Sequence, residues 1–91
     1  MSVINYKYDI GTKVKAKHEL IILNIDDDTG EEYEIIIPEG SSGVIESWSR
    51  SSKYDKAIYG VIFIVGEDEM PEISFFEDDL ENELYIESNQ P

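Results

Sequence analysis

The amino-acid sequence predicts an all-β fold, a small closed or half-open barrel of five to seven short antiparallel strands. Short β-branched and aromatic runs recur along the chain, and Gly, Pro, Asp or Ser residues bound each of them. No window of ten or more residues carries apolar residues at the i, i+3, i+4, i+7 spacing of a helix. The chain has only 91 residues, too few to fill two separate sheets, so barrel closure would also protect the strand edges. We expect a single domain over residues 1–91, with the last few residues disordered.

Alternation of polar and apolar residues predicts the first strand, and β-branched runs predict the next two. Residues 13–17 alternate polar and apolar side chains, as a half-buried strand does. Leu20–Ile25 and residues 33–37 are β-branched runs on either side of the acidic residues 26–30. Asp and Gly in that connection favour a tight turn. The sequence therefore predicts an acidic hairpin over residues 20–37, in addition to the strands of the barrel.

A turn and a further strand follow the hairpin. Residues 38–43 read P-E-G-S-S-G, a composition typical of a turn, and residues 44–48 form the next predicted strand. Residues 47–53 read S-W-S-R-S-S-K. This polar stretch predicts a loop.

Residues 58–65 form the strongest predicted strand. Tyr59, Val61, Phe63 and Val65 share one face, and Ile58, Gly60, Ile62 and Ile64 share the other. Strands at Ile73–Phe76 and residues 84–86 follow, joined by the acidic segment Glu77–Glu83. We expect that segment to be a loop with at most one helical turn, at residues 78–80. The predicted core residues are Val14, Ile45, Val61, Phe63, Ile73 and Leu84.

The order of motifs resembles that of small SH3-like β-barrels. From Ile37 the chain reads I-P-E-G-S-S-G-V-I, then Y-G-V-I-F from Tyr59, I-S-F from Ile73, and D-D-L at residues 78–80. In those barrels P-x-G-x-x-G-x-V precedes Y-x-V-x-F, an acidic loop and a D-L turn. The resemblance covers about residues 37–84 and implies an SH3-like barrel, from which the acidic hairpin and Gly60 depart. Many such domains are free-standing bacterial proteins, some encoded near toxin genes, and the shared motifs concern the fold alone.

The charge narrows the range of partners. Seven Lys and Arg stand against twenty-one Asp and Glu, a formal net charge of −14. Solubility of a small domain needs a net charge of only about 2 to 8 in magnitude. The excess repels nucleic acids and anionic membranes, so we expect no direct nucleic-acid partner and no membrane partner. No stretch approaches the roughly 20 apolar residues of a membrane span, and residues 1–17 lack the apolar core of a signal peptide. These features favour a cytoplasmic protein.

The sequence carries no signature of an enzyme. The absence of Cys excludes disulfides and zinc–thiolate sites. His18 is the only histidine, and we expect it on the surface or at a strand edge. None of the serines lies in a nucleophile-elbow motif. The acids come in runs, which are typical of solvated loops, whereas acid–base catalysis needs two carboxyls in different environments.

Asp26, Asp28 and Glu32, around Gly30, are candidate calcium ligands. The EF-hand loop requires Gly after its third oxygen ligand and Glu at its twelfth position. When the loop is counted from Asn24, Thr29 falls at that Gly position and Ile35 at that Glu position. The motif fails, and we expect no metal and no other cofactor.

The remaining features predict a binding protein, and two classes stay open. The first is an acidic inhibitor of a basic, nucleic-acid-acting protein, such as an immunity protein for a nuclease toxin or a phage inhibitor of a defence nuclease. Nuclease clefts are basic because they hold phosphates, and an acidic partner is steered to them. The second is a non-catalytic SH3-like adaptor or accessory domain that binds a peptide or a larger assembly. On a third interpretation the acids serve solubility alone.

Candidate partner-binding residues come from two acidic segments, which we expect to share one flank of the barrel, and from one aromatic anchor. They are Glu67, Asp68, Glu69, Glu72, Glu77, Asp78, Asp79, Glu81, Glu83 and Trp48. Aromatic side chains dominate binding hot spots, and Tyr54 and Phe76 are further candidate anchors. Each of the three aromatic residues also fits a core position.

Overall fold

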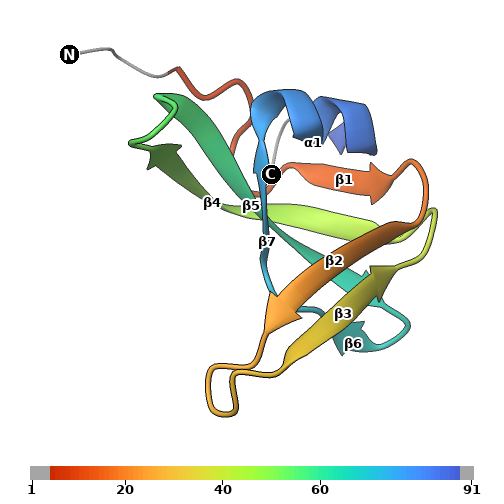
Figure 1. Cartoon of the computed structure of the whole chain (residues 1–91). Coiled ribbons are helices and arrows are strands. Elements are labelled where there is room, and N and C mark those ends of the chain that lie inside the picture. The colour runs from red at the N-terminus through yellow and green to blue at the C-terminus, as the bar shows by residue number, and fades with distance from the viewer. Residues whose placement is uncertain (1–4, 89–91) are drawn as a thin grey trace.

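The computed structural model describes residues 5–88 (Figure 1). The C-terminal residues, for which the sequence predicts disorder, lie outside the described range. Residues 5–88 form eight strands and one helix. In chain order they are β1 (Lys13–Ala16), β2 (Leu20–Ile25), β3 (Glu32–Ile37), β4 (Ser42–Ser51), β5 (Lys56–Val65), β6 (Asp68–Glu69), β7 (Ile73–Phe76), α1 (Glu77–Glu83) and β8 (Leu84–Ser88).

The strands of residues 5–88 form two antiparallel sheets. The larger sheet has the order β6-β5-β4-β1-β8, and β7 pairs with β5 on the same side as β6. The smaller sheet is the β2–β3 hairpin, in which Leu20 pairs with Ile37 and Ile25 with Glu32. The predicted all-β class and the predicted acidic hairpin are both confirmed.

The larger sheet does not close into a barrel, so the closed form, one of the two that the sequence leaves open, is wrong. Its edges are β8 on one side and β6 and β7 on the other, and within residues 5–88 no ladder joins them. Side chains cover the sheet in place of a closing ladder. Leu80 of α1 and Leu20, Ile35 and Ile37 of the hairpin are buried in the same apolar core as the sheet residues.

Two strand predictions need correction. The segment from Ser47 to Ser51 belongs to β4 and is not a loop, because it pairs with β5 through Ser51 and Lys56. The described strands number eight rather than five to seven, since β6 adds a two-residue strand beyond a turn at Gly66. A polar strand and a two-residue strand both depend on the ladder of a neighbour, which local composition does not reveal.

The segment Glu77–Glu83 is a seven-residue helix, so the expected loop with at most one helical turn is wrong. Glu77, Asp78 and Asp79 lie in its first turn, where the helix dipole favours negative charge. Leu80 is its one buried side chain. A helix with a single buried residue shows no apolar periodicity in the sequence. Within residues 5–88 no helix has the length and apolar character to cross a bilayer.

The predicted core is confirmed. All six predicted residues are buried, from Val14 on β1 to Leu84 on β8. Tyr59, Val61 and Phe63 lie on the buried face of β5, whereas Ile64 on the other face is exposed. The two faces of the strongest strand are therefore oriented as its alternation predicts.

Candidate functional site

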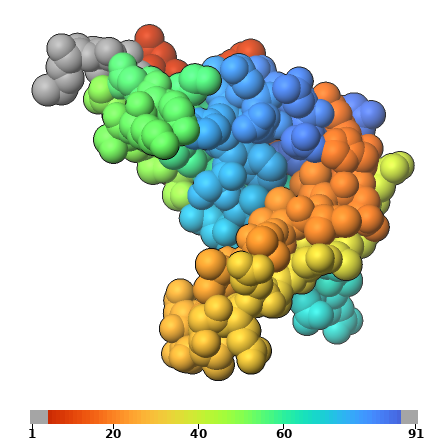
Figure 2. Space-filling model, viewed as in Figure 1, coloured from red at the N-terminus to blue at the C-terminus, as the bar shows by residue number. Residues whose placement is uncertain are grey.

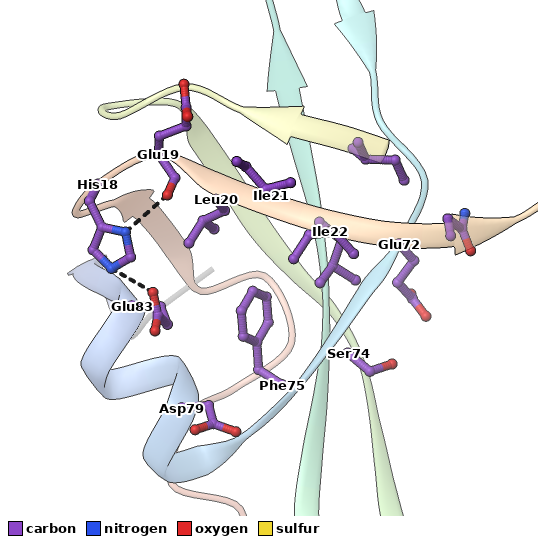
Figure 3. Close-up of a pocket in the computed structure, with 13 residues that line it drawn as sticks. His18, Glu19, Leu20, Ile21, Ile22, Glu72, Ser74, Phe75, Asp79 and Glu83 are labelled. Carbon is purple, nitrogen blue, oxygen red and sulfur yellow. Dashed lines mark hydrogen bonds and ion pairs between the residues drawn. The ribbon is translucent and has the colours of Figure 1, made fainter. Parts of the chain in front are cut away.

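An open groove of about 560 Å³ lies between β2 and the β7–α1 segment (Figure 3). The buried and half-buried part of its apolar lining consists of Leu20, Ile22, Ile35, Ile73 and Phe75. The other lining residues are His18, Glu19, Ile21, Asn24, Glu72, Ser74, Asp79 and Glu83. The groove thus combines an apolar floor with four carboxylates, a combination that suits a cationic, partly apolar occupant.

Strand alternation and the start of the helix create this arrangement. Ile73 and Phe75 face inward from β7, and α1 begins directly after that strand. Asp79 and Glu83 are four residues apart on α1 and therefore lie on the same face of the helix. Figure 3 shows both side chains on the groove side, with the ring of Phe75 between α1 and β2.

His18 closes one end of the groove. Its Nδ1 lies 3.0 Å from the backbone oxygen of Glu19, and its Nε2 lies 2.5 Å from Oε2 of Glu83 (Figure 3). The ring is exposed, as the sequence predicts. The contact with Glu83 joins the chain between β1 and β2 to α1.

Glu72 owes its position to Gly60. The Ser47 hydroxyl donates a hydrogen bond of 3.3 Å to Oε2 of Glu72. A Cβ atom on Gly60 would lie 2.6 Å from Cδ of Glu72 and would also collide with the Ser47 hydroxyl. The absent side chain, which departs from the SH3-like pattern, makes room for this polar pair beside the groove.

The two acidic segments do not share one flank, so that expectation is wrong. Glu67, Asp68 and Glu69 lie at the β5–β6 turn, at the other end of the molecule from α1 (Figures 1 and 2). The ten-residue strand β5 carries the chain to that end, and β7 then returns it toward α1. Of the first segment only Glu72 lines the groove, where it joins Asp79 and Glu83.

Three acids of α1 already have partners within the chain. Glu77 accepts a hydrogen bond of 2.8 Å from the Tyr59 hydroxyl, and Glu83 contacts His18. Glu81 accepts bonds of 2.6 Å from both the Lys7 ammonium and the Tyr8 hydroxyl. The hydrogen bond from Lys7, followed by that from Tyr8, lowers the pKa of Glu81 below its ordinary value. These carboxylates hold the N-terminal segment and His18 against the fold.

Trp48 also contacts the N-terminal segment. Its ring is 40% exposed and stacks on Tyr6, with centroids 4.8 Å apart. Its Nε1 donates a hydrogen bond of 2.8 Å to the backbone oxygen of Tyr8. Tyr54 and Phe76 form an edge-to-face pair at 5.7 Å. None of the three aromatic candidates lines the groove.

The sequence does not predict the groove. Its lining comes from residues 18–24, Ile35 and residues 72–83, which only the tertiary structure brings together. Within the described segment no group of three or more His, Asp or Glu residues is placed to hold a metal ion. In the hairpin turn, Oδ1 of Asp26 instead accepts hydrogen bonds from the backbone N–H groups of Asp28 and Thr29.

Comparisons of the chain with protein-family models, with curated proteins and with solved structures find no match.

Proposed function

We propose that this chain is a cytoplasmic acidic inhibitor, without enzymatic activity, that binds and neutralises a basic nucleic-acid-acting protein. A nuclease toxin or a defence nuclease is such a partner. The observation that carries the proposal is the excess of carboxylates over cations. The four ion pairs found within residues 5–88 engage four of the twenty-one acids. The remaining charge steers a basic partner at long range.

The groove supplies the short-range part of the proposed interaction. Glu72 and Asp79 are exposed at its rim, and Ile22 and Phe75 form part of its floor. A Lys or Arg side chain of the partner places its aliphatic stem on such a floor and its charge beside the carboxylates. Buried contacts of this kind govern dissociation, whereas the exposed charges govern association.

The fold that we propose for this inhibitor follows from the resemblance to SH3-like barrels. Once the β2–β3 hairpin and the short strand β6 are set apart, β1, β4, β5 and β7 lie side by side in chain order, and the last strand, β8, pairs with the first, β1. α1 stands before the last strand, in the place of the D-L turn of the resembled pattern. We therefore propose an open SH3-like barrel with an inserted acidic hairpin.

One observation favours the adaptor alternative. A second hollow, of about 270 Å³, places Phe76 beside Asp55, Glu77 and Asp78. An aromatic ring next to carboxylates suits a short basic peptide. If the adaptor function is correct, Phe76→Ala weakens partner binding, whereas Glu72→Lys/Asp79→Lys, which alters the groove, does not.

The test begins with co-purification from the native cell and identification of the bound protein. The proposal expects a basic nucleic-acid-acting protein whose activity falls when purified inhibitor is added. Association is then measured at two salt concentrations for Glu72→Lys/Asp79→Lys and for the control pair Glu39→Lys/Glu46→Lys. Both pairs reverse two exposed acids, but only the first lines the groove.

The groove pair should associate more slowly than the control pair, and the gap should shrink as salt rises. Equal rates for the two pairs would remove the groove from the interface. A captured partner that is not basic, or that stays active when bound, would overturn the proposed function.

A further inference from the structure

The outward face of the β2–β3 hairpin exposes four large aliphatic side chains. Ile21, Leu23 and Ile25 follow one another along β2 and are 59%, 63% and 57% exposed, and Ile36 on β3 is 49% exposed. We call this surface, with Glu32 and Glu34, the hairpin outer face. Figure 2 shows the tip of the hairpin, in orange and yellow, projecting away from the rest of the molecule.

The sequence of β2 is that of a strand covered on both faces. It reads L-I-I-L-N-I, a nearly continuous apolar run, whereas a strand with one solvated face alternates apolar and polar residues. In the described structure only one face is covered: Leu20 is buried and Ile22 half-buried, while the outward residues face solvent. β2 and β3 pair only with each other in residues 5–88. No strand of residues 5–88 therefore pairs with the hairpin, and its outward aliphatic row is left facing solvent.

The acidic residues beside the apolar row indicate which kind of surface would cover that face. On β3, Glu34 lies opposite Leu23 and Glu32 lies opposite Ile25. Paired strands are about 4.8 Å apart, so an acidic row runs directly beside the apolar row. The turn at the tip adds Asp26, Asp27 and Asp28. The complementary surface has an apolar row flanked by Lys or Arg.

A second copy of the chain does not provide that complement. Each copy carries a charge of −14, so two copies repel each other. Face-to-face packing would also bring Glu32 and Glu34 against the partner copy's aliphatic or acidic row, with no cation to compensate them. The face instead suits a basic protein.

We propose that the hairpin outer face is a docking surface for an extended segment of a basic partner protein, in which every second residue points toward the hairpin and these residues include both apolar side chains and Lys or Arg. The inference rests on the proposed function, because the partner is the basic protein postulated there. Ile21 belongs both to this face and to the groove, so the two surfaces are continuous around β2. The apolar row supplies contact area, and the acidic row supplies register and specificity.

The probe is a peptide of about ten residues in which valine and lysine occupy every second position in turn, with serine between them, so that both point to one face of the extended peptide. It is compared with an equally charged peptide that has serine in place of each valine. Calorimetry measures the affinity of each for the full chain. The variant is Ile21→Thr/Leu23→Thr/Ile25→Thr, in which threonine preserves the preference for strand. Ile64→Thr is the control, because Ile64 is also a strand residue, 44% exposed, on β5.

The wild type should bind the valine peptide at least about tenfold more tightly than the serine peptide, a gap of about 1.4 kcal/mol. The triple variant should lose this difference and the Ile64→Thr control should keep it. Glu32→Gln/Glu34→Gln should weaken binding of the valine peptide more than Glu39→Gln/Glu46→Gln does. Circular dichroism and melting temperature should stay unchanged for all variants, since the replaced side chains are exposed.

Equal affinity of the wild type for the two peptides, or a difference that survives in the triple variant, would overturn the docking surface. So would a dimer of the free protein, in analytical ultracentrifugation, that the triple variant dissolves. If the peptide results hold but no basic partner is found, the proposed function fails and the docking surface stands. If a basic partner is inhibited equally by wild type and triple variant, the proposed function stands and the docking surface fails.

Discussion

Replacing Tyr59 by Phe tests how the N-terminal segment is held to the sheet. Tyr59 is fully buried on β5, and its hydroxyl accepts hydrogen bonds from the backbone N–H groups of Lys7 at 2.8 Å and Tyr8 at 3.4 Å. The same hydroxyl donates to Glu77 at 2.8 Å. One oxygen atom thus joins the N-terminal segment, β5 and α1.

The expected loss can be worked from these contacts. A buried donor left without an acceptor costs about 1–3 kcal/mol, and a typical hydrogen bond contributes about 1 kcal/mol. The Lys7 N–H is only partly buried and regains water, and the bond from Tyr8 is long. We therefore expect Tyr59→Phe to lower the free energy of unfolding by about 2 kcal/mol. For a domain of this size that corresponds to a fall of roughly 8–16 °C in melting temperature.

Urea denaturation measures this loss, and the slope of the free energy against urea should not change. Tyr54→Phe is the matched control, since the Tyr54 ring is exposed, and it should change stability by less than about 0.5 kcal/mol. A loss below about 0.5 kcal/mol for Tyr59→Phe would refute the reasoning. The N-terminal segment would then depend on Trp48 and Glu81 instead.

Alkaline pH supplies an independent readout for the same residue. Burial, followed by the hydrogen bond to Glu77, raises the pKa of Tyr59 from 10.0 to about 12. The folded state therefore keeps the phenol proton to higher pH than the unfolded state does. This contribution is complete below pH 10 and is lost as pH rises from 10 to about 12. Tyr59→Phe should lose less stability than the wild type across that window, and parallel curves would contradict the assignment.

Three further predictions concern the core, Gly60 and the charge. Phe63→Ala removes a fully buried ring and should cost about 3–5 kcal/mol by urea denaturation; a loss under about 1 kcal/mol would place the wrong face of β5 in the core. Gly60→Ala should destabilise the fold by about 1–3 kcal/mol because its Cβ meets Glu72, and adding Glu72→Ala and Ser47→Gly should restore most of the loss. Salt at about 0.5 M shortens the Debye length to about 4 Å. Because ion pairs in residues 5–88 engage few of the acids, this screening should raise the melting temperature. An unchanged melting temperature would mean that repulsion among the acids is small.

Because the acids of α1 lie in a helix, only some of them can be replaced by lysine without disturbing the fold. Reversing Glu77, Asp78 and Asp79 together would leave the fold intact if they lay in a loop, as the sequence suggests. In the structure they occupy the first turn of α1, and Glu77 accepts a bond from Tyr59. Lysines there would oppose the helix dipole and break that bond. Reversing Asp79 and Glu72 keeps the bond between Tyr59 and Glu77, places only one lysine in the first turn of α1, and still alters the groove.

The sequence by itself determined the features that depend on local periodicity. Alternation along residues 58–65 placed Tyr59, Val61 and Phe63 on the buried face, because successive strand residues point to opposite sides. The β-branched runs around the acidic turn at Gly30 likewise predicted the β2–β3 hairpin. In each case neighbouring residues contain all the information required.

Only the tertiary structure decided the features that depend on distant pairing. Ser47 to Ser51 form a strand because β5 offers them a ladder, although their own composition favours a loop. The larger sheet is open, and Leu80 and the hairpin residues Leu20, Ile35 and Ile37 share its buried core. The acids of α1 were identifiable by composition, but their partners Lys7, Tyr8 and Tyr59 lie far away in the chain. Charge is a property of composition, whereas the division of carboxylates between internal contacts and the groove arises only when the chain folds.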